Sequence, residues 1–264
     1  MKKQTKHQLT LKIRRFDPEN MRAGYQTYHL EAGGVQRFVD LFRMINDTQD
    51  PTLAWNSSCE HGQCGTCSVR INGLPVLACE LLVENAVQDF KTTSFTIDPL
   101  EVVLVVRDLA IDIEKVYENL DRIKPYIIEP ITAGEKQPHQ IAPELLEQYV
   151  EATRCINCFC CASACISSHR RFLGPNAMLS TIVRLMDPRE KSKQERLEVL
   201  YSDEGVLRCH SSHACSKVCP KEIDVAHFIA MAKSGAVHKS AATARVGGMR
   251  MAQGRCRDHS AGGR

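Results

Sequence analysis

The feature that most constrains this chain is a pair of cysteine series in its C-terminal half. The first runs from Cys155 to Cys165, and the second runs from Cys209 to Cys219 and is followed by Pro220. The steps follow C-x2-C-x2-C-x3-C, a spacing that binds two iron-sulfur clusters: three thiolates of a series hold one cluster, and the fourth crosses to the other. The sequence therefore predicts two clusters in this region.

The two series are not equivalent. The first has a cysteine at every ligand position and Cys160 in addition, whereas the second has Ser212 at its second ligand position. One cluster thus has four thiolates and the other has three, and a site that lacks one thiolate most simply holds a 3Fe-4S cluster. The predicted ligands are Cys155, Cys158, Cys161 and Cys219 for a 4Fe-4S cluster, and Cys165, Cys209 and Cys215 for a 3Fe-4S cluster.

Three alternatives are ranked lower. A Ser212 alkoxide on a fourth iron is disfavoured because a hydroxyl is harder and much less acidic than a thiol. Structural zinc sites use C-x2-C knuckles rather than triplets at three-residue steps. A disulfide framework is disfavoured because the 13 cysteines are odd in number and clustered, which indicates a reducing compartment. Cys160 is interpreted as a packed free thiol, and Cys256 is not expected to be a ligand.

A third cysteine group lies in the N-terminal half. Its spacing is C-x4-C-x2-C with a remote fourth cysteine, the plant-type pattern of a 2Fe-2S cluster. The predicted ligands are Cys59, Cys64, Cys67 and Cys79. Gly62 and Gly65 would let the loop curl tightly and bring backbone N–H groups close to the cluster sulfurs. No histidine stands at a ligand position, which argues against a Rieske centre, and His61 is interpreted as a solvated loop residue.

Hydrophobic patterning around this group predicts a sheet with one helix. Apolar residues alternate over 9–13, which indicates a half-buried strand, and Tyr25–Leu30 is a second candidate. Apolar residues then recur at helical spacing over 35–45. Further strands are expected after Cys79 up to Val83 and around Phe95–Ile97. The order strand, strand, helix, followed by the cluster motif, predicts a β-grasp ferredoxin domain.

The remainder of the chain is predicted to be helical, with apolar stripes over 145–150, 179–186 and 225–229 that are expected to form a core. With 264 residues the chain is long enough for two domains. The fold class is therefore α+β, an N-terminal β-grasp 2Fe-2S ferredoxin domain before an all-helical two-cluster ferredoxin domain. The expected boundaries are 1–112 for the first domain, 113–142 for a linker, 143–234 for the helical domain and 235–264 for a basic, disordered tail.

Charge and hydropathy exclude several classes of protein. Residues 235–264 carry Lys239 and five arginines against Asp258, so the chain without this tail is close to neutral and nucleic-acid binding is not expected. No apolar run approaches the roughly 20 residues that span a bilayer. Residues 1–12 lack the apolar region of a secretory signal, and Arg14-Arg15 is not followed by one either.

These motifs together resemble the iron-sulfur subunit of succinate dehydrogenase and fumarate reductase. One 2Fe-2S motif precedes two interleaved cluster motifs, as in that family, and the likeness covers roughly residues 9–235. It extends beyond the cysteines to Val106–Asp112, Ile123–Tyr126, Phe172–Pro175 and Cys219–Lys221.

The resemblance implies an electron relay without a catalytic residue of its own. Electrons would pass between the FAD of a flavoprotein subunit, which interconverts succinate and fumarate, and a quinone at membrane anchor subunits. The chain would lie on the cytoplasmic face of the inner membrane, peripheral and held by its partners. The alternatives are the same three-cluster relay on a different flavin-dependent organic-acid dehydrogenase, and a non-redox structural zinc protein.

The quinone end departs from the family pattern. Many members have Pro after the cysteine matching Cys165 and Trp five residues after it, where this chain has Ile166 and Arg170, and its one tryptophan is Trp55. His210 matches a family residue near the quinone. The resemblance thus implies a quinone vicinity at His210, Arg170 and Ser212, lined differently from most members and suited to menaquinone or another variant. The plainer interpretation is that His210 and Arg170 cap helices or contact a partner subunit.

Overall fold

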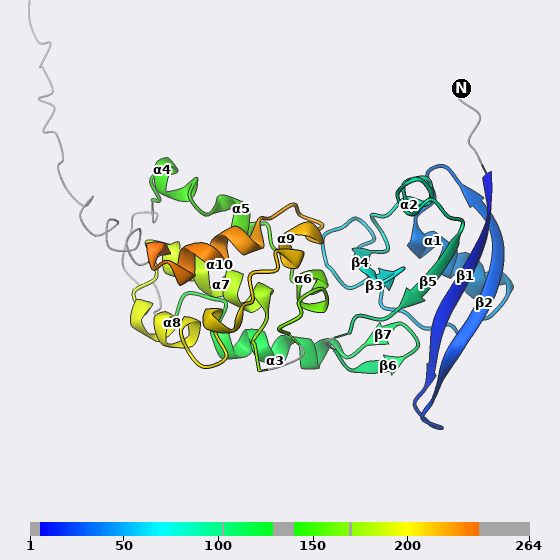
Figure 1. Cartoon of the computed structure of the whole chain (residues 1–264), viewed down its shortest axis with the longest axis horizontal. Helices are drawn as coiled ribbons and strands as arrows, with labels where there is room; N and C mark the ends of the chain where they lie inside the picture. The colour runs from blue at the N-terminus through cyan, green and yellow to red at the C-terminus, as the bar shows by residue number, and fades with distance from the viewer. Residues whose placement is uncertain (1–5, 102, 129–139, 169–170, 238–264) are drawn as a thin grey trace, which may run out of the picture.

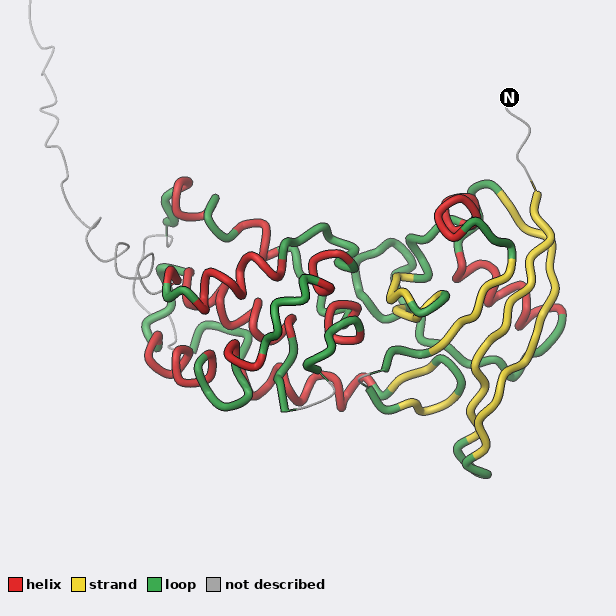
Figure 2. Tube along the Cα trace, in the orientation of Figure 1, coloured by secondary structure: helices red, strands yellow, loops and turns green. Residues whose placement is uncertain are grey.

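The computed structural model describes residues 6–101, 103–128, 140–168 and 171–237, and it shows two domains side by side along the long axis (Figure 1). The sheet domain, residues 6–111, contains all the strands of the described chain, and the helical domain, residues 113–237, contains most of its helices (Figure 2). This order confirms the predicted α+β fold of a sheet domain followed by a helical domain.

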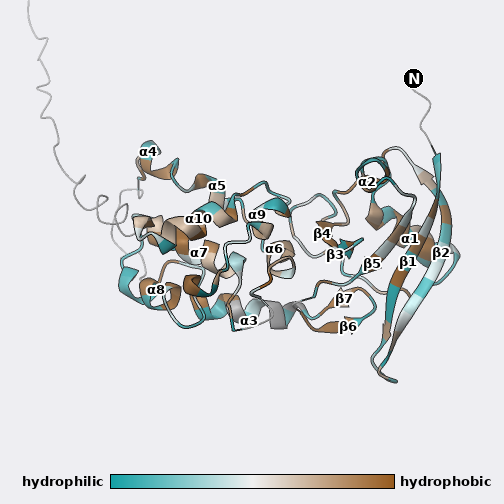
Figure 3. Ribbon diagram, in the orientation of Figure 1, coloured by the Kyte–Doolittle hydropathy of each residue, from teal (hydrophilic) through white to brown (hydrophobic). Residues whose placement is uncertain are grey.

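Five strands form the main sheet, in the spatial order β2-β1-β5-β3-β4. The elements of this part are β1 (Lys6–Asp17), β2 (Arg22–Gly33), α1 (Phe38–Thr48), β3 (Ser68–Ile71), β4 (Leu74–Leu77), α2 (Val83–Phe90) and β5 (Ser94–Asp98). Strand β1 pairs with β2 as a long antiparallel hairpin and with β5 in parallel. The alternation predicted over 9–13 is confirmed, since Leu9, Leu11 and Ile13 are buried. Figure 3 shows hydrophobic and hydrophilic residues in alternation along β1.

Helix α1 covers one face of this sheet. Its apolar residues are buried at helical spacing, as predicted over 35–45, and Phe38 packs edge-on against Phe95 with 5.2 Å between ring centroids. Val35, which is 70% exposed, lies before the helix. The core of the sheet domain therefore forms between α1 and the inner strands.

The strand predicted between Cys79 and Val83 is wrong. Leu82 makes only an isolated bridge with Arg37, and helix α2 begins at Val83. Val83 and Ala86 are both buried and three residues apart, so they share one face of a helix rather than alternate across a strand. The strand predicted around Phe95–Ile97 is confirmed as β5.

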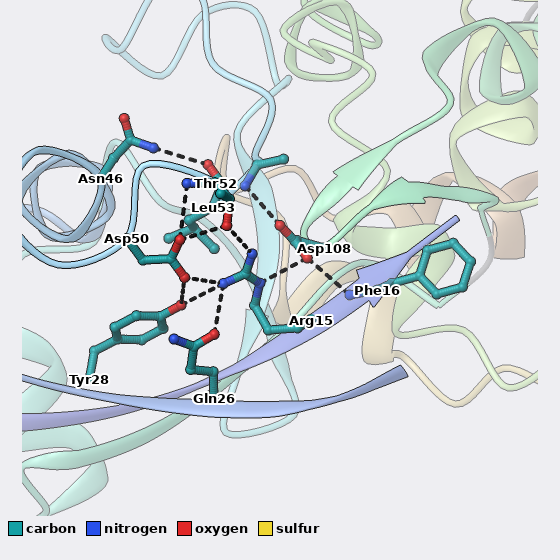
Figure 4. A network of polar contacts seen from close by, with 10 residues as sticks. Arg15, Phe16, Gln26, Tyr28, Asn46, Asp50, Thr52, Leu53 and Asp108 are labelled. Atoms are coloured by element: carbon teal, nitrogen blue, oxygen red, sulfur yellow. Dashed lines mark hydrogen bonds and ion pairs between the residues drawn. The ribbon is translucent and has the colours of Figure 1, made fainter. Parts of the chain in front are cut away.

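A polar network holds in place the segment that precedes Cys59 and the cysteine group of the N-terminal half (Figure 4). Arg15 of β1 donates hydrogen bonds to Tyr28 Oη at 2.7 Å and to Asp108 Oδ1 at 2.9 Å, and it pairs with Asp50. Asp108 in turn accepts from the backbone N–H of Ala54 at 3.0 Å. The network thereby ties β1 to residues 50–54 and to the turn at Asp108, and these positions determine where the following cysteine loop starts.

The polar network also shifts the pKa of its members. Burial opposes ionisation of Asp50, but hydrogen bonds from Thr52, Tyr28 and Arg15 hold the pKa of Asp50 below its usual range. Burial, followed by the bond to Asp50, raises the pKa of Tyr28 to about 12. Asp50 is therefore ionised and Tyr28 neutral at physiological pH.

Helix α7 lies at the centre of the helical domain. The hairpin of β6 (Val105–Arg107) and β7 (Ala110–Ile111) ends the sheet domain and leads into the helical one. The elements of the helical domain are α3 (Ile113–Ile123), α4 (Pro143–Leu146), α5 (Val150–Thr153), α6 (Cys160–Ser163), α7 (Pro175–Met186), α8 (Lys193–Leu200), the 3-10 helix η1 (Val206–Arg208), α9 (Ala214–Lys217) and α10 (Val225–Lys233). Helix α7 packs against α3, α5, α6, α8 and α10. The stripes predicted over 179–186 and 225–229 are confirmed as the buried faces of α7 and α10, whereas the stripe over 145–150 is split between α4 and α5.

The structure differs from the expected linker of residues 113–142 in its first part. Residues 113–123 form helix α3, whose Leu120 and Ile123 are buried in the core of the helical domain. The buried Arg196 holds the end of α3, because it donates to the carbonyls of Ile123 and Lys124 and pairs with Glu190 at 2.8 Å. Residues 129–139 of the expected linker lie outside the described residues.

None of the helices in the described ranges has the length and apolar content that crossing a bilayer requires. The predicted tail falls almost wholly on residues 238–264, which lie outside the described residues, as does Cys256 within it.

Candidate metal centres

The cysteine group of the N-terminal half forms a tight loop over residues 59–67, here called the cluster loop. Backbone N–H groups surround its sulfurs: those of Gln63 and Cys64 each donate to Cys59 Sγ at 3.3 Å, and that of Gly62 donates to Cys79 Sγ at 3.3 Å. Such donors stabilise negative charge on sulfur. The predicted role of the loop amides is therefore reflected in its geometry, and the cluster loop suits an anionic group.

Two glycines of the cluster loop have left-handed backbone conformations, with φ of +65° at Gly62 and +73° at Gly65. A Cβ at Gly62 would collide with the side chain of Glu80, and a Cβ at Gly65 would lie 2.7 Å from Cys158 Cα. Glycine is needed at both positions, for its conformation and for its lack of a side chain. Gly65 has a further consequence, because Cys158 belongs to the helical domain.

The four thiols of the N-terminal group lie close enough to shift one another's pKa. Burial opposes ionisation of Cys64, but hydrogen bonds involving Thr66 and Cys59 lower its pKa to about 7. Burial, and then the neighbouring thiols of Cys79 and Cys64, raise the pKa of Cys67 to about 12. The structure thus brings together Cys59, Cys64, Cys67 and Cys79. His61 is exposed, as expected for a solvated loop residue.

The second site is a cavity in the helical domain, here called the four-thiol cavity. It is lined by Cys155, Cys158, Cys161 and Cys219. Side chains of α7 and α10, among them Leu179 and Val225, complete its wall. Burial, followed by the thiols of Cys158 and Cys219, raises the pKa of Cys155 to about 11. The thiols that the crossing rule assigned to one cluster are therefore neighbours around one cavity.

The third site is a second cavity in the helical domain, here called the three-thiol cavity. Its lining includes Cys165, Cys209 and Cys215. Ser212 lines the same cavity, and the backbone N–H of Ser211 donates to Cys209 Sγ at 3.4 Å. Burial, and then the thiols of Cys209 and Cys165, raise the pKa of Cys215 to about 11.

The thiols surround a space rather than converge on a point. Among the described residues, no group of three or more His, Cys, Asp or Glu side chains is close enough to hold a single metal ion. Thiols arranged around a cavity suit a cluster of several atoms, which each thiolate would bind at a different iron.

The residues predicted near a quinone are only partly placed. His210 and Ser212 line the three-thiol cavity and are exposed to solvent, so this cavity reaches the surface. Ile166 and Leu207 nearby in sequence are 62% and 69% exposed. Arg170 lies outside the described residues.

The cluster loop and the four-thiol cavity meet at the domain interface. Cys160 of α6 is fully buried in the core of the sheet domain, and its Sγ donates to Ser68 Oγ at 3.7 Å. The Nζ of Lys221 pairs with Glu80 Oε1 at 3.0 Å across the same interface. Ser68 follows Cys67 and Glu80 follows Cys79, so these contacts join residues adjacent to predicted ligands.

Sequence reasoning missed this interface. It left Cys160 as a packed thiol without naming what it packs against, and it gave the cluster-loop glycines only a local role. The spare cysteine inside the first series was the one available signal, since a buried thiol needs a buried neighbour. On the other side of the four-thiol cavity, helix α6, which carries Cys161, packs against helix α9, which carries Cys215, so the two cavities are also neighbours.

Comparisons with known proteins agree with the cysteine pattern. Residues 10–118 match the family described as 2Fe-2S iron-sulfur cluster binding domain, and residues 151–223 match the family described as 4Fe-4S dicluster domain. Among curated proteins, the fumarate reductase iron-sulfur subunit of Wolinella succinogenes is 32% identical over 230 residues, covering 84% of this chain and 94% of that protein.

Two further relatives extend the comparison. The succinate dehydrogenase [ubiquinone] iron-sulfur subunit 2, mitochondrial, of Oryza sativa subsp. japonica is 31% identical over 224 residues, which cover 83% of this chain and 71% of that protein. Among solved structures, a chain of the Mycobacterium smegmatis Sdh1 complex in the apo form superimposes with a TM-score of 0.75 at 25% identity, covering 89% of this chain and 98% of that one.

Proposed function

The chain belongs to the family of the iron-sulfur subunits of fumarate reductase and succinate dehydrogenase, and we infer from this that it carries electrons between a flavoprotein subunit and a membrane quinone. It is thus the electron-transfer subunit of an oxidoreductase complex, and binding of the dicarboxylate is assigned to the flavoprotein subunit. The family carries 2Fe-2S, 4Fe-4S and 3Fe-4S clusters, and these, when bound, supply one-electron carriers.

Each of the three thiol groups is assigned one cluster. The cluster loop with Cys79 holds the 2Fe-2S cluster, the four-thiol cavity the 4Fe-4S cluster, and the three-thiol cavity the 3Fe-4S cluster. The first assignment is supported by the backbone N–H groups that donate to Cys59 and Cys79. The other two assignments are supported by the number of thiols in each lining, four in the four-thiol cavity and three in the three-thiol cavity. In the three-thiol cavity, Ser212 stands at the position where a fourth thiol would complete the set.

The observation that carries the proposal is that the three groups adjoin in series. Gly65 of the cluster loop lies against Cys158 of the four-thiol cavity, and helix α6, which carries Cys161 of that cavity, packs against helix α9, which carries Cys215 of the three-thiol cavity. The backbone and side chains of this chain thus hold three one-electron sites in a row. A row of such sites divides the two-electron chemistry of a flavin into single transfers that a quinone can accept.

The two ends of the row face different partners. The three-thiol cavity reaches solvent beside His210, with the exposed Ile166 and Leu207 close by in sequence, and this surface is assigned to the membrane anchor and its quinone. The sheet domain at the opposite end is assigned to the FAD-containing flavoprotein subunit. The chain would then be peripheral, held at the cytoplasmic face of the inner membrane by these partners.

The test is to purify the chain with its native partners from membranes and add succinate under anaerobic conditions. The proposal predicts that a flavin-containing subunit copurifies and that succinate alone reduces the 2Fe-2S and three-iron centres, seen by EPR. If dithionite reduces the clusters and succinate does not, the relay serves another flavin-dependent dehydrogenase. If zinc replaces iron and no cluster signal appears, the proposal fails altogether.

A further inference from the structure

Ser167 is one of the residues that line the three-thiol cavity, and its buried hydroxyl has no hydrogen-bond partner among the described residues. The residue is 2% exposed, and its Oγ has essentially no contact with solvent. It lies two positions after Cys165 and lines the cavity together with Cys209 and Cys215. None of the relay functions described above uses this side chain.

Buried hydroxyls in proteins are nearly always hydrogen bonded, because a polar group removed from water without a partner is costly. Within the described residues, no protein atom accepts a hydrogen bond from Ser167 Oγ. The lining of the cavity combines the three thiols with apolar side chains such as those of Pro175, Ala226 and Ile229. A donor left over at the wall of a cavity points to an acceptor that occupies the cavity.

The thiols of the same cavity indicate what that acceptor is. A cluster bound by Cys165, Cys209 and Cys215 would bring sulfur atoms with negative charge into the space beside Ser167. Hydrogen bonds to cluster sulfurs raise the reduction potential, because the reduced state carries more negative charge and gains more from a donor.

We propose that Ser167 is a positioning residue for the cluster of the three-thiol cavity, donating its hydroxyl hydrogen to a sulfur of that site and thereby raising the reduction potential of the centre nearest the quinone. This inference rests on the proposed function, because it requires a cluster in the cavity. It assigns a role to a residue that is not itself an iron ligand, and it explains why a hydroxyl is retained in a buried position.

A neighbouring residue provides a matched control. Ser168 Oγ is also buried without a partner among the described residues, but Ser168 does not line the three-thiol cavity. Both serines follow the same ligand, Cys165, so general damage to this segment should affect the two positions similarly. Only an effect through the cavity separates Ser167 from Ser168.

The experiment is a potentiometric EPR titration of the purified complex carrying Ser167→Ala, Ser167→Thr or Ser168→Ala. We expect Ser167→Ala to shift the midpoint potential of the three-iron signal to lower values, and Ser167→Thr, which keeps the hydroxyl, to remain close to the wild type. Ser168→Ala should leave the potential unchanged, and the 2Fe-2S and 4Fe-4S potentials should be the same in all variants.

The outcomes separate this inference from the proposed function. Loss of the three-iron signal in Ser167→Ala alone would also support the hydroxyl contact, because the hydroxyl-bearing Ser167→Thr would still retain the signal. An unchanged potential in Ser167→Ala, an equal shift in Ser168→Ala, or loss of the signal in both Ser167 variants would overturn the inference while the relay stands. Absence of a three-iron signal from the wild-type complex would instead overturn the ligand assignment, and the inference with it.

Discussion

The two cavities of the helical domain are built from the same two cysteine series, yet they differ at one ligand position and in their surroundings. The four-thiol cavity is closed by Cys219 and lies against the sheet domain through Cys158. The three-thiol cavity has Ser212 in place of a thiol and is bordered by exposed residues such as His210. No residue that lines the four-thiol cavity is exposed, whereas several that line the three-thiol cavity are.

This difference teaches that the number of thiols and the position in the fold act together. A four-iron cluster in the interior can exchange electrons with both neighbours, because a group of thiols lies on each side of it. A three-iron cluster at the surface has one such neighbour and an open side. The replacement of a single thiol by Ser212 therefore coincides with the end of the row that is proposed to lie nearest the quinone.

The largest effect is expected when the complete cavity is made incomplete. Cys219→Ser should abolish the 4Fe-4S signal and lower the iron content, because the cavity loses the thiol that joins the second cysteine series to the first. The loss of affinity should exceed the roughly 10- to 100-fold that follows removal of a residue hydrogen-bonded to a metal ligand. Iron analysis and EPR of the purified complex would measure it.

Cys160→Ser is the matched control for that substitution, since Cys160 lies in the same series as Cys158 but does not line the four-thiol cavity. It should retain all three clusters. The opposite result would be loss of the four-iron signal in Cys160→Ser and its retention in Cys219→Ser. That result would mean that the crossing rule assigns the wrong thiols.

The next effect completes the incomplete cavity. Ser212→Cys should convert the three-iron centre to a four-iron centre, adding one iron per chain and lowering the reduction potential, because a fourth thiolate supplies the missing ligand and more negative charge. Ser211→Cys is the control, because its thiol stands at the wrong step of the series. A three-iron signal that persists in fully loaded Ser212→Cys would argue against the assignment.

A smaller effect is expected at the contact between Gly65 of the cluster loop and Cys158 of the four-thiol cavity. Gly65→Ala places a Cβ 2.7 Å from Cys158 Cα and forces alanine to a φ of +73°, at a cost of about 1–3 kcal/mol or more in stability. The 2Fe-2S and 4Fe-4S signals should change and the three-iron signal should not. Gly73→Ala, at a φ of +82° with no atom within 4 Å, shares the backbone strain without the collision and should leave all signals intact.

The smallest effect should leave both cavities untouched. Asp50→Asn weakens the network around Arg15, and it should lower the free energy of unfolding of the sheet domain by about 1–3 kcal/mol at neutral pH. Since the folded pKa of Asp50 lies below the unfolded value of about 3.9, its contribution is complete above that pH and is lost as the pH falls below it. The difference between variant and wild type should therefore shrink in acid.

Fluorescence of Trp55, the single tryptophan of the chain, can follow this unfolding because it packs beside Phe42 in the sheet domain. Asp47→Asn, which changes an exposed carboxylate of α1, is the control and should have little effect. A loss of cluster signals in Asp50→Asn would show that the network supports the metal centres more directly than its position suggests.

The short steps within each series, such as that from Cys155 to Cys158, were readable because they are local. The combination of thiols from two distant series, such as Cys219 with Cys155, came instead from the crossing rule of this motif, and the structure lines each of the two cavities with the thiols that the rule assigns to it. The long strands and the buried face of α7 were predicted from a local pattern, since their apolar periodicity is strong.

Contacts between distant segments were not predictable. The approach of Gly65 to Cys158 and the pairing of Cys160 with Ser68 depend on how two domains pack, which no local pattern encodes. Helix α2 was missed because its apolar residues, Val83 and Ala86, are too few to distinguish helical from strand spacing. The hydroxyl of Ser167 has meaning only once its burial and the missing partner are known.

The most direct test of the central claim is low-temperature EPR of the anaerobically purified complex, oxidised and then reduced with dithionite, with iron, sulfide and zinc analysis of the same sample. We expect a three-iron signal in the oxidised protein and 2Fe-2S and 4Fe-4S signals after reduction. Two four-iron centres and no three-iron signal would contradict it, because Ser212 or another group would then complete the cavity described here as lacking a ligand.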